Sequence, residues 1–365
     1  MNNNDEMYMF RALNIAKKGE GFVNPNPLAG VVIVKEGKII SEGYHKFFGG
    51  PHAEIYALGE AGIKAKGADL YVNIEPCSQY AKTPPCVDAI VKAGIKRVVI
   101  AIQDPNPLLS GKGIRFLKRC GIEVVTGVLE EDARRLNEIY IKYKTSNLPF
   151  VIMKTVMSLD GTLITDTGES EYVLSEESRD YLRKMRNKVM GIMMGVNTLI
   201  NDDPSLTVRL KERPYISPKA IIIDPRLQIP EGAKILNTIK EREIIIACTQ
   251  GYSEEKRVLL EGLGIKIIVT PQMDEGQVDM KYLIKELGDH GIDSIIVEGG
   301  NELGYASIDS EIIDKVMCFI TPKMLKDSKE KEKSPETGNI LNSDILVKNM
   351  SSKKIGGDLL IEGYL

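Results

Sequence analysis

The chain has 365 residues, of which 43% are hydrophobic and 27% are charged. This composition is typical of globular proteins, and the length favours two domains over one. The formal net charge of −3 argues against nucleic acid as a partner, because proteins that bind it usually carry a basic surface. The start of the chain lacks a signal-peptide pattern, and no apolar run is long enough to cross a bilayer. We therefore expect a cytoplasmic protein with no membrane partner.

The first domain is expected at residues 1–146 and the second at 147–365, joined by the short polar stretch 144–149. Strand and helix patterns alternate through the first half, which predicts a three-layer α/β domain. Its expected helices are 7–18, 52–61, 85–93 and 114–119, and its expected strands are 29–34, 38–41, 68–74, 97–102 and 123–126.

The second half also predicts an α/β domain. It opens with a strand at 150–157 and continues with a helix at 175–188, for which Ser175 is the expected N-cap. Further short apolar strands are expected at 189–194, 220–224, 243–247, 265–269, 294–297 and 315–320. The charged stretch 326–337 predicts a loop.

One imidazole, two thiols and one carboxylate form the strongest chemical pattern in the chain. His52, Cys77 and Cys86 supply three zinc ligands, and catalytic zinc keeps three protein ligands with a fourth position for water. Glu54 lies two residues after the His, where it could take a proton from water and return it to leaving ammonia. This combination is the chemistry of nucleobase deamination. The remaining cysteines are expected to be core residues: Cys120, Cys248 and Cys318.

Sequence motifs around these residues resemble the cytidine-deaminase-like superfamily. More narrowly, both halves resemble the bifunctional riboflavin-biosynthesis deaminase/reductases. In the first half the matching segments are NPNPLAG at 24–30, HAE at 52–54, EPCS at 75–78, KTPPC at 82–86 and DPNP at 104–107. In the second half they are SLDG at 158–161, TGES at 167–170, GVNT at 195–198, DDPSLT at 202–207 and EGG at 298–300.

The resemblance implies two consecutive reactions on a small phosphorylated pyrimidine. The first is zinc-dependent deamination of 2,5-diamino-6-(5-phosphoribosylamino)pyrimidin-4(3H)-one. The second is NADPH reduction of the ribosyl group of 5-amino-6-(5-phosphoribosylamino)uracil to ribityl. It also implies a cytidine-deaminase-like α/β/α domain, a dihydrofolate-reductase-like α/β domain and a homo-oligomer. The chain agrees in lacking a G-x-G-x-x-G after the first strand of its second half.

The resemblance assigns substrate contacts in both halves. In the first half they are Asn26, His45 and Lys82, although a turn asparagine, a hydrogen-bonded strand-end histidine and a solvated lysine are the plain alternatives. In the second half they are Ser170, Arg186, Leu206, Arg209 and Glu298, and arginine suits phosphate because its guanidinium can bind two oxygens. We expect two further residues to orient the sugar and assist proton transfer, or else to form a structural ion pair: Lys154 and Asp160.

The NADPH contacts implied by the resemblance are spread over the second half. Gly299 and Gly300 precede a helix-like stretch, where glycines allow a phosphate to approach the helix N-terminus. On its own this signal is weak. The positions that match the family are Val156, Tyr172, Thr198, Asp202, Pro225, Gly300, Asn301, Glu302, Leu303 and Gly304.

Four departures from the family pattern leave an alternative open. Gln79 replaces a usual His, Tyr172 a usual Trp and Thr162 a usual basic residue, and residues 324–327 replace a usual Gly-Gly. The alternative is a deaminase alone, with the second half a non-reducing substrate-binding or assembly domain. A nucleic-acid base deaminase and a non-catalytic zinc protein are further alternatives, disfavoured by the acidic balance and by the three-ligand set.

Overall fold

The computed structural model describes residues 3–80, 84–161, 163–164, 173–208, 215–273, 276–324 and 344–365. The chain divides into two compact units, Met1–Asn147 and Leu148–Leu365. Both units are α/β, as the sequence predicts. Among the described residues, no helix combines the length and apolar character needed to cross a membrane.

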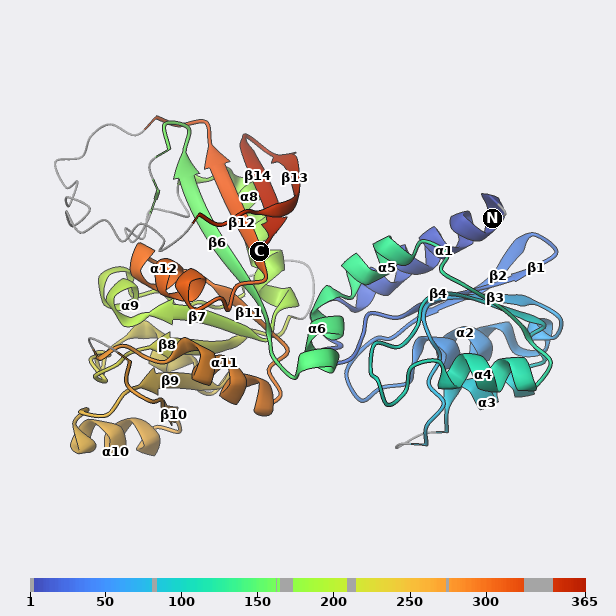
Figure 1. Ribbon diagram of the computed structural model, residues 1–365, viewed down its shortest axis with the longest axis horizontal. Helices are drawn as coiled ribbons and strands as arrows, with labels where there is room; N and C mark the ends of the chain where they lie inside the picture. Colours follow the sequence, from blue (N-terminus) through green and yellow to red (C-terminus); the bar gives the residue numbers. More distant parts are fainter. Residues whose placement is uncertain are drawn as a thin grey trace. The chain divides into compact units, whose positions relative to one another are not determined.

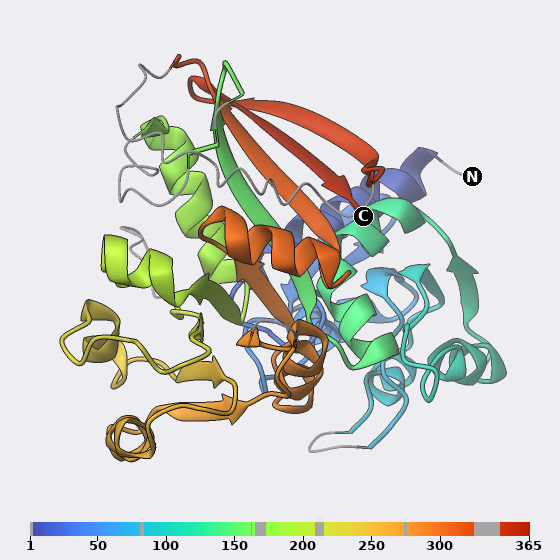
Figure 2. The same cartoon turned by 60° about the vertical axis from the view of Figure 1, so that its left-hand side comes forward.

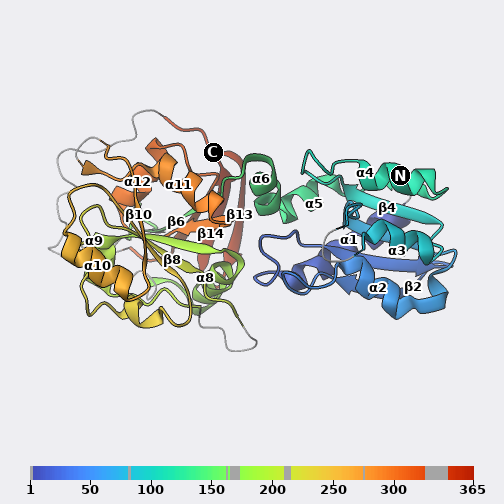
Figure 3. The same ribbon diagram turned by 90° about the horizontal axis from the view of Figure 1, so that it is seen from below.

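Unit 1 is a five-stranded sheet with helices on both faces (Figure 1). Strand β1 is antiparallel to both of its neighbours, and the remaining pairs are parallel, in the order β2-β1-β3-β4-β5. Helices α1 and α5 contact each other on one face, while α2, α3 and α4 cover the other, which faces the viewer in Figure 3. The strands are β1 (Gly30–Lys35), β2 (Lys38–Tyr44), β3 (Asp69–Ile74), β4 (Arg97–Ile102) and β5 (Glu123–Thr126). The helices are α1 (Asn3–Ala16), α2 (Ala53–Ala61), α3 (Cys86–Lys92), α4 (Lys112–Arg119), α5 (Glu130–Leu136) and α6 (Glu138–Ser146), with short 3-10 turns at Lys17–Gly19 and Gly62–Ala65.

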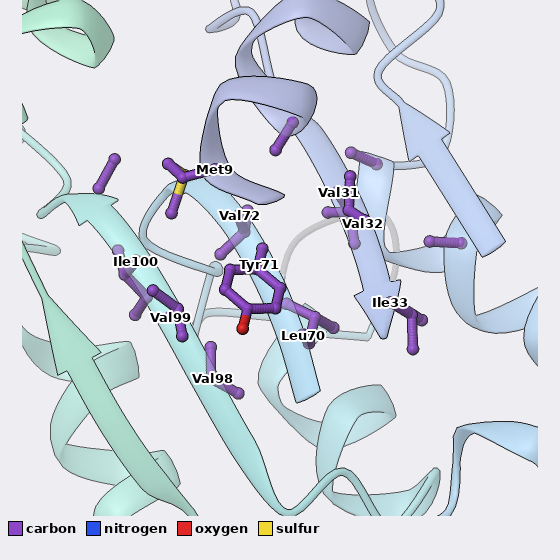
Figure 4. Close-up of a cluster of buried hydrophobic side chains, with 14 of the residues drawn as sticks. Met9, Val31, Val32, Ile33, Leu70, Tyr71, Val72, Val98, Val99 and Ile100 are labelled. Atoms are coloured by element: carbon purple, nitrogen blue, oxygen red, sulfur yellow. The ribbon is translucent and has the colours of Figure 1, made fainter. Parts of the chain in front are cut away.

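The core of unit 1 forms on both faces of its central strands. Val31, Leu70 and Val99, from β1, β3 and β4, are fully buried, and Met9 of α1 packs above the sheet (Figure 4). Strands covered on both faces read as continuous apolar runs rather than as alternating patterns. This is why these strands were recognisable in the sequence.

A buried polar cluster ties α1 to the sheet. Arg97 at the start of β4 donates two hydrogen bonds to the carboxylate of Asp5, at 3.0 and 2.8 Å, and the Tyr71 hydroxyl donates a third at 2.8 Å. The hydrogen bonds from Arg97 are the main cause that lowers the pKa of Asp5, against the opposing effect of burial. The cluster explains why α1 begins before the expected residue 7, since Asp5 lies in its first turn.

Unit 2 is a nine-stranded sheet in the order β10-β9-β8-β7-β11-β6-β12-β14-β13. The seven strands from β10 to β12 are parallel, and β14 is antiparallel to β12 and β13. Figure 2 shows the C-terminal pair beside β12 and β6. The strands are β6 (Phe150–Ser158), β7 (Gly191–Gly195), β8 (Lys219–Ile223), β9 (Ile244–Cys248), β10 (Lys266–Val269), β11 (Ser294–Val297), β12 (Lys315–Thr321), β13 (Lys348–Ile355) and β14 (Asp358–Tyr364). The helices are α8 (Glu176–Lys188), α9 (Val196–Asp202), α10 (Glu254–Gly262), α11 (Met280–Asp289) and α12 (Asn301–Asp309), with a 3-10 turn, η3, at Lys234–Thr238.

The parallel strands of unit 2 bring several connecting segments to one edge of the sheet. Leu283 of α11 and Leu303 of α12 pack in one buried cluster with Val151 and Ile295 of the central strands. The segments after β7, β8 and β11 lie at one edge of the sheet, because the carboxyl ends of parallel strands lie together. Ligands of open α/β sheets usually bind at this edge.

One boundary was predicted wrongly from the sequence, and one hairpin was missed. The expected linker 144–149 is too long, because α6 continues to Ser146 and only residues 147–149 precede β6. Thr145 remains helical and its hydroxyl donates to the carbonyl of Ile141 at 2.9 Å. The hairpin β13–β14 was not predicted, since all residues of β13 except the last are exposed and show no apolar alternation.

The prediction that the three other cysteines are core residues is partly wrong. Cys248 is buried, Cys318 is half-buried and Cys120 is exposed. Cys120 lies at the C-terminal end of α4, beyond the buried face of that helix. Its apolar sequence neighbours belong to the buried side, which misled the prediction.

Candidate functional site

The structure brings the three predicted zinc ligands of unit 1 together. His52 immediately precedes α2, Cys86 opens α3 and Cys77 follows the end of β3. The Nδ1 atom of His52 lies 3.4 Å from Sγ of Cys77 and 3.3 Å from Sγ of Cys86. All three ligand atoms lie within 4.8 Å of one another. This spacing fits one tetrahedral zinc ion.

A glycine in β2 makes room for His52. A Cβ atom at Gly43 would lie 2.4 Å from the carbonyl oxygen of Ala53, the first residue of α2. Any side chain there would push the start of α2 away from the sheet. Gly43 thus permits the close approach that sets the position of His52.

The charge state of the two thiols also fits a metal cation. Hydrogen bonds from Cys86 and His52 lower the pKa of Cys77 to about 4. The pKa of Cys86 is raised, because this thiol is hydrogen-bonded to Cys77 and buried. Two adjacent thiolates repel each other, so one proton stays on the pair. A divalent cation bound by both sulfurs would displace this proton, because metal coordination deprotonates thiols.

Glu54 lies in the first turn of α2 and is buried, with 4% of its surface exposed. Burial is the main cause that raises its pKa, and the negative charge of Cys77 adds to it. Its carboxylate also interacts with the thiol of Cys86. A carboxyl group with a raised pKa beside a metal site is suited to accept and return a proton near neutral pH.

Asn26 and His45 form a hydrogen-bonded pair beside the zinc ligands. The Nδ1 atom of His45 lies 2.9 Å from the carbonyl oxygen of Pro51, which can only accept, so Nδ1 carries the proton. Nε2 then accepts from the side-chain amide of Asn26 at 3.1 Å. Burial lowers the pKa of His45, which keeps this neutral form. The ring of His45 meets that of His52 edge-on, with centroids 5.6 Å apart.

Sequence reasoning missed Glu75 as a residue that shapes the site. Its buried carboxylate accepts hydrogen bonds from the backbone N–H groups of Asp104, Gly111 and Ile114, at 3.1, 2.9 and 3.1 Å. These bonds hold the segment after β4 against the residues that lead to Cys77. The available signal was a carboxylate directly after an apolar strand, where an unpartnered charge would be costly.

Two buried asparagines that were also missed fix the loop that carries Asn26. Asn137 accepts from the N–H of Leu28 at 2.8 Å and donates to its carbonyl at 3.1 Å. Asn73 donates to the same carbonyl at 2.8 Å and accepts from the N–H of Gly30 at 2.7 Å. The loop is therefore held from two sides, and Asn26 is presented to His45.

In unit 2 the structure brings together Arg186, Glu298 and Lys154. Arg186 of α8 donates two hydrogen bonds to Glu298, at 3.0 and 2.6 Å, and both residues are buried. Burial alone would raise the pKa of Glu298, but the charges of Arg186 and Lys154 outweigh it and lower the pKa to about 2. Part of the Arg186 guanidinium is thus already occupied by protein, which the sequence did not indicate.

The remaining predicted substrate residues of unit 2 are placed differently. Leu206 is buried and has a left-handed backbone with φ of 50°. Asp160 is exposed beyond the end of β6 and accepts a hydrogen bond from Ser158. Lys154 lies inside β6, and its charge acts on Glu298. Four predicted residues lie outside the described part of the chain: Lys82, Ser170, Tyr172 and Arg209.

The predicted NADPH cradle coincides with the start of α12. Gly299 has φ of 137°, and a Cβ atom there would lie 3.4 Å from Oγ1 of Thr198. The same hydroxyl accepts a hydrogen bond from the N–H of Gly300 at 3.2 Å. Glu302 is exposed and accepts from the side chain of Asn197 at 3.2 Å. Thr198 thus shapes the cradle, and later N–H groups of the helix start remain for an anionic ligand.

Other predicted NADPH contacts lie around the same edge of the sheet. Pro225 follows β8, Asp202 ends α9 and Val156 is buried within β6. The side chain of Leu303 belongs to the core, so a cofactor could meet only its backbone. Asn301 opens α12, and Gly304 lies in its first turn.

The fold and the His/Cys/Cys centre define the class of protein. Residues 2–102 match the zinc-binding region of cytidine and deoxycytidylate deaminases, and residues 149–361 match the RibD C-terminal domain. A riboflavin biosynthesis protein RibD from Aquifex aeolicus is 44% identical over 88% of each chain. Another from Actinobacillus pleuropneumoniae is 37% identical, with 97% of this chain and 94% of the relative covered.

Solved structures agree over nearly the whole chain. Acinetobacter baumannii RibD aligns with a TM-score of 0.82 at 32% identity, covering 99% of this chain and 98% of the other. A Thermotoga maritima structure titled as a diaminohydroxyphosphoribosylaminopyrimidine deaminase and 5-amino-6-(5-phosphoribosylamino)uracil reductase aligns with a TM-score of 0.79, also at 32% identity and with the same coverage. The chain therefore belongs to the RibD family, and it carries both the deaminase and the reductase domain of that family.

Proposed function

We propose that this chain catalyses two consecutive steps of riboflavin biosynthesis. Unit 1 deaminates 2,5-diamino-6-(5-phosphoribosylamino)pyrimidin-4(3H)-one, and unit 2 reduces the ribosyl group of the resulting 5-amino-6-(5-phosphoribosylamino)uracil with NADPH. The observation that carries this proposal is the presence of both family domains in one chain, with the zinc ligand set assembled in the first.

In the deaminase, His52, Cys77 and Cys86 hold zinc, which supplies a water activated for attack near neutral pH. Glu54 accepts the proton of the attacking water and delivers it to the leaving amino group. Its burial beside the ligands favours this exchange, since the group is poised to hold either state. Asn26 and His45 bind the pyrimidine, and Lys82 binds its oxygen or the phosphate.

In the reductase, the cluster around Glu298 holds the ring-opened sugar phosphate. Arg186 and Lys154 fix the charge of Glu298, so that it accepts hydrogen bonds from sugar hydroxyls. The further substrate contacts in the proposal are Ser170, Leu206, Arg209 and Asp160. NADPH supplies the hydride, and the proposed contacts are Val156, Tyr172, Thr198, Asp202, Pro225, Gly300, Asn301, Glu302, Leu303 and Gly304.

The proposal divides the activities between residues 1–146 and 147–365. It places the protein in the cytoplasm as a homo-oligomer that needs neither nucleic acid nor a membrane. The departures at Gln79, Thr162, Tyr172 and 324–327 are compatible with activity in this proposal. Gln79 is exposed, and tyrosine can still stack on a ring.

The alternative of a deaminase alone is not favoured. The second half matches the RibD C-terminal domain over 149–361 and retains the charged Glu298 cluster. The helix start after Gly299 and Gly300, where NADPH is proposed to bind, favours a reductase over a domain that binds only the substrate.

A split assay on purified, zinc-loaded protein tests the proposal. Ammonia release is followed first without a cofactor, and NADPH is then added. The expected result is stoichiometric ammonia followed by stoichiometric NADPH oxidation, with NADH as the comparison cofactor. Ammonia without NADPH oxidation would support the deaminase-only alternative, and no ammonia would contradict the assignment of the zinc centre.

A further inference from the structure

Arg242 is a buried arginine of unit 2 that neither the motifs nor the cofactor contacts include. It lies just before β9, and 6% of its surface is exposed. Burying a guanidinium is costly unless its N–H groups are satisfied. The hydrogen-bond partners of Arg242 therefore indicate which part of unit 2 it stabilises.

Every recorded hydrogen bond of Arg242 goes to a neutral oxygen. Nε donates to the hydroxyl of Thr238 at 3.1 Å. Nη1 donates to the carbonyl of Leu206 at 2.7 Å and to that of Pro218 at 3.1 Å. Nη2 donates to the carbonyl of Ser205. Four of the five guanidinium donors are thus bound to protein, so the main role of Arg242 is to hold the residues that it contacts.

The residues held by Arg242 belong to the segment that carries Leu206, a proposed substrate contact. Leu206 has a left-handed backbone, which non-glycine residues adopt only when their surroundings hold them there. Arg242 binds the carbonyls of the two peptide units that flank the Cα atom of Leu206, and it ties them to the carbonyl of Pro218. The guanidinium of Arg242 also binds the hydroxyl of Thr238, and this hydroxyl donates to the carbonyl of Ile235 at 2.7 Å.

The charge of Arg242 is not neutralised by a carboxylate among the described residues. Besides burial, the positive charge of Arg186 lowers the pKa of Arg242 to about 10, while the charge of Glu241 acts in the opposite direction, so Arg242 remains charged at neutral pH. Arg186 and Lys154 share the single carboxylate of Glu298. The contribution of Arg242 is thus carried by its hydrogen bonds to Thr238, Leu206 and Pro218.

We propose that Arg242 is a positioning residue of the reductase, which holds Ser205 and Leu206 in the conformation that binds the sugar phosphate. This inference rests on the proposed function of unit 2. It predicts a specific defect, in which affinity for the pyrimidine sugar phosphate falls while NADPH binding and deamination are retained.

Arg242→Gln is the first variant, assayed by NADPH oxidation with 5-amino-6-(5-phosphoribosylamino)uracil. We expect the KM for this substrate to rise about ten- to hundredfold, as is typical when a binding segment shifts slightly. The KM for NADPH should change much less, because the helix start proposed to bind its phosphates is held by Thr198 and not by Arg242. Ammonia release from the same preparation serves as an internal control and should be unchanged.

Two milder variants keep the test decisive if Arg242→Gln does not fold. Arg242→Lys retains the charge but cannot bind four separate oxygens, so we expect a KM increase between those of wild type and Arg242→Gln. Thr238→Val removes one anchor of the fork, and we expect an increase of about two- to fivefold. The matched control is Arg257→Gln on α10, which loses a surface pair with Glu261 and should leave KM unchanged.

An unchanged substrate KM in folded Arg242→Gln, or in both milder variants, would overturn the inference. An equal rise in the KM values of substrate and NADPH would also overturn it, because it would indicate general disruption of the unit. If wild-type protein itself releases ammonia but does not oxidise NADPH, the proposed function of unit 2 fails first. The wild-type assay therefore separates the two failures.

Discussion

Glu54 in unit 1 and Glu298 in unit 2 are buried to nearly the same extent, with 4% and 3% of their surfaces exposed. Their pKa values nevertheless move in opposite directions. Burial and a neighbouring thiolate raise the pKa of Glu54, whereas two cations lower that of Glu298 to about 2. Burial alone therefore does not decide what a carboxylate does. Its charged neighbours favour the protonated form of one group and the charged form of the other.

The two sites also differ in what holds them together. The unit 1 centre consists of three ligand side chains that converge at the starts of two helices and after a strand. Zinc is needed to let both thiols ionise. The unit 2 cluster contains its own counter-charges, because Arg186 binds both oxygens of Glu298. One site is completed by a metal, and the other is complete within the protein.

The largest expected effect comes from removing a zinc ligand. Cys77→Ser should lose zinc and with it all measurable ammonia release, because a serine hydroxyl is a poor zinc ligand. Reduction of supplied 5-amino-6-(5-phosphoribosylamino)uracil should persist. Metal analysis and the two activity assays measure this. Cys120→Ser, at the exposed cysteine, is the matched control, and zinc retention with full activity in Cys77→Ser would refute the ligand assignment.

Glu54→Gln should slow ammonia release by about 10²- to 10⁴-fold, the usual contribution of a general acid–base group. The amide keeps the size of the side chain but cannot carry the proton. Zinc content and NADPH oxidation should match wild type. Glu60→Gln, at an exposed position of the same helix, is the control. Loss of zinc in Glu54→Gln would instead place Glu54 among the ligands.

Arg186→Met should destabilise unit 2 by about 3–5 kcal/mol, because it leaves the buried Glu298 without its main partner. It should also raise the reductase KM, since an unpaired Glu298 takes up a proton. Denaturant unfolding and NADPH oxidation measure the two effects. The control is Arg183→Met on the same helix, whose surface pair with Asp180 should contribute less than about 1 kcal/mol. Equal behaviour of the two variants would contradict the buried cluster.

The smallest expected effect is the pH dependence of unit 2. The pKa of Glu298 is lowered from 4.5 to about 2 in the folded state, so the unfolded chain binds the proton more tightly. This stabilisation, about 3 kcal/mol, is complete above about pH 4.5 and is lost as the pH falls towards 2. The unfolding free energy of wild type and Glu298→Gln, measured between pH 7 and 3, should converge at low pH. Parallel curves would show that Glu298 is not a permanent anion.

Much of the zinc centre could be predicted from the sequence because its ligands lie in short motifs at element ends. His52 and Cys86 are each placed by a local helix start, and the Pro76-Cys77 pair follows shortly after the apolar strand β3. The α/β class of both units follows from their continuous apolar strands. The exposed strand β13 and the helical residues 144–146 lacked such patterns, and these were missed or misassigned.

The partners of buried polar groups were beyond sequence reasoning. Arg186 and Glu298 are 112 residues apart, and nothing local indicates that they pair. The same holds for Glu75 with the segment after β4, for Asn137 with Leu28 and for Arg242 with Leu206. These contacts depend on which strands become neighbours in the sheet.

The sequence by itself determined the alternation of strands and helices and the identity of the metal-binding side chains, because both depend on residues close together along the chain. Only the tertiary structure showed what sets the charge of each buried carboxylate, with the charge of Cys77 acting on Glu54 and two cations acting on Glu298. The reason is physical. A pKa depends on burial and on charges within a few ångströms, and only folding brings those charges together.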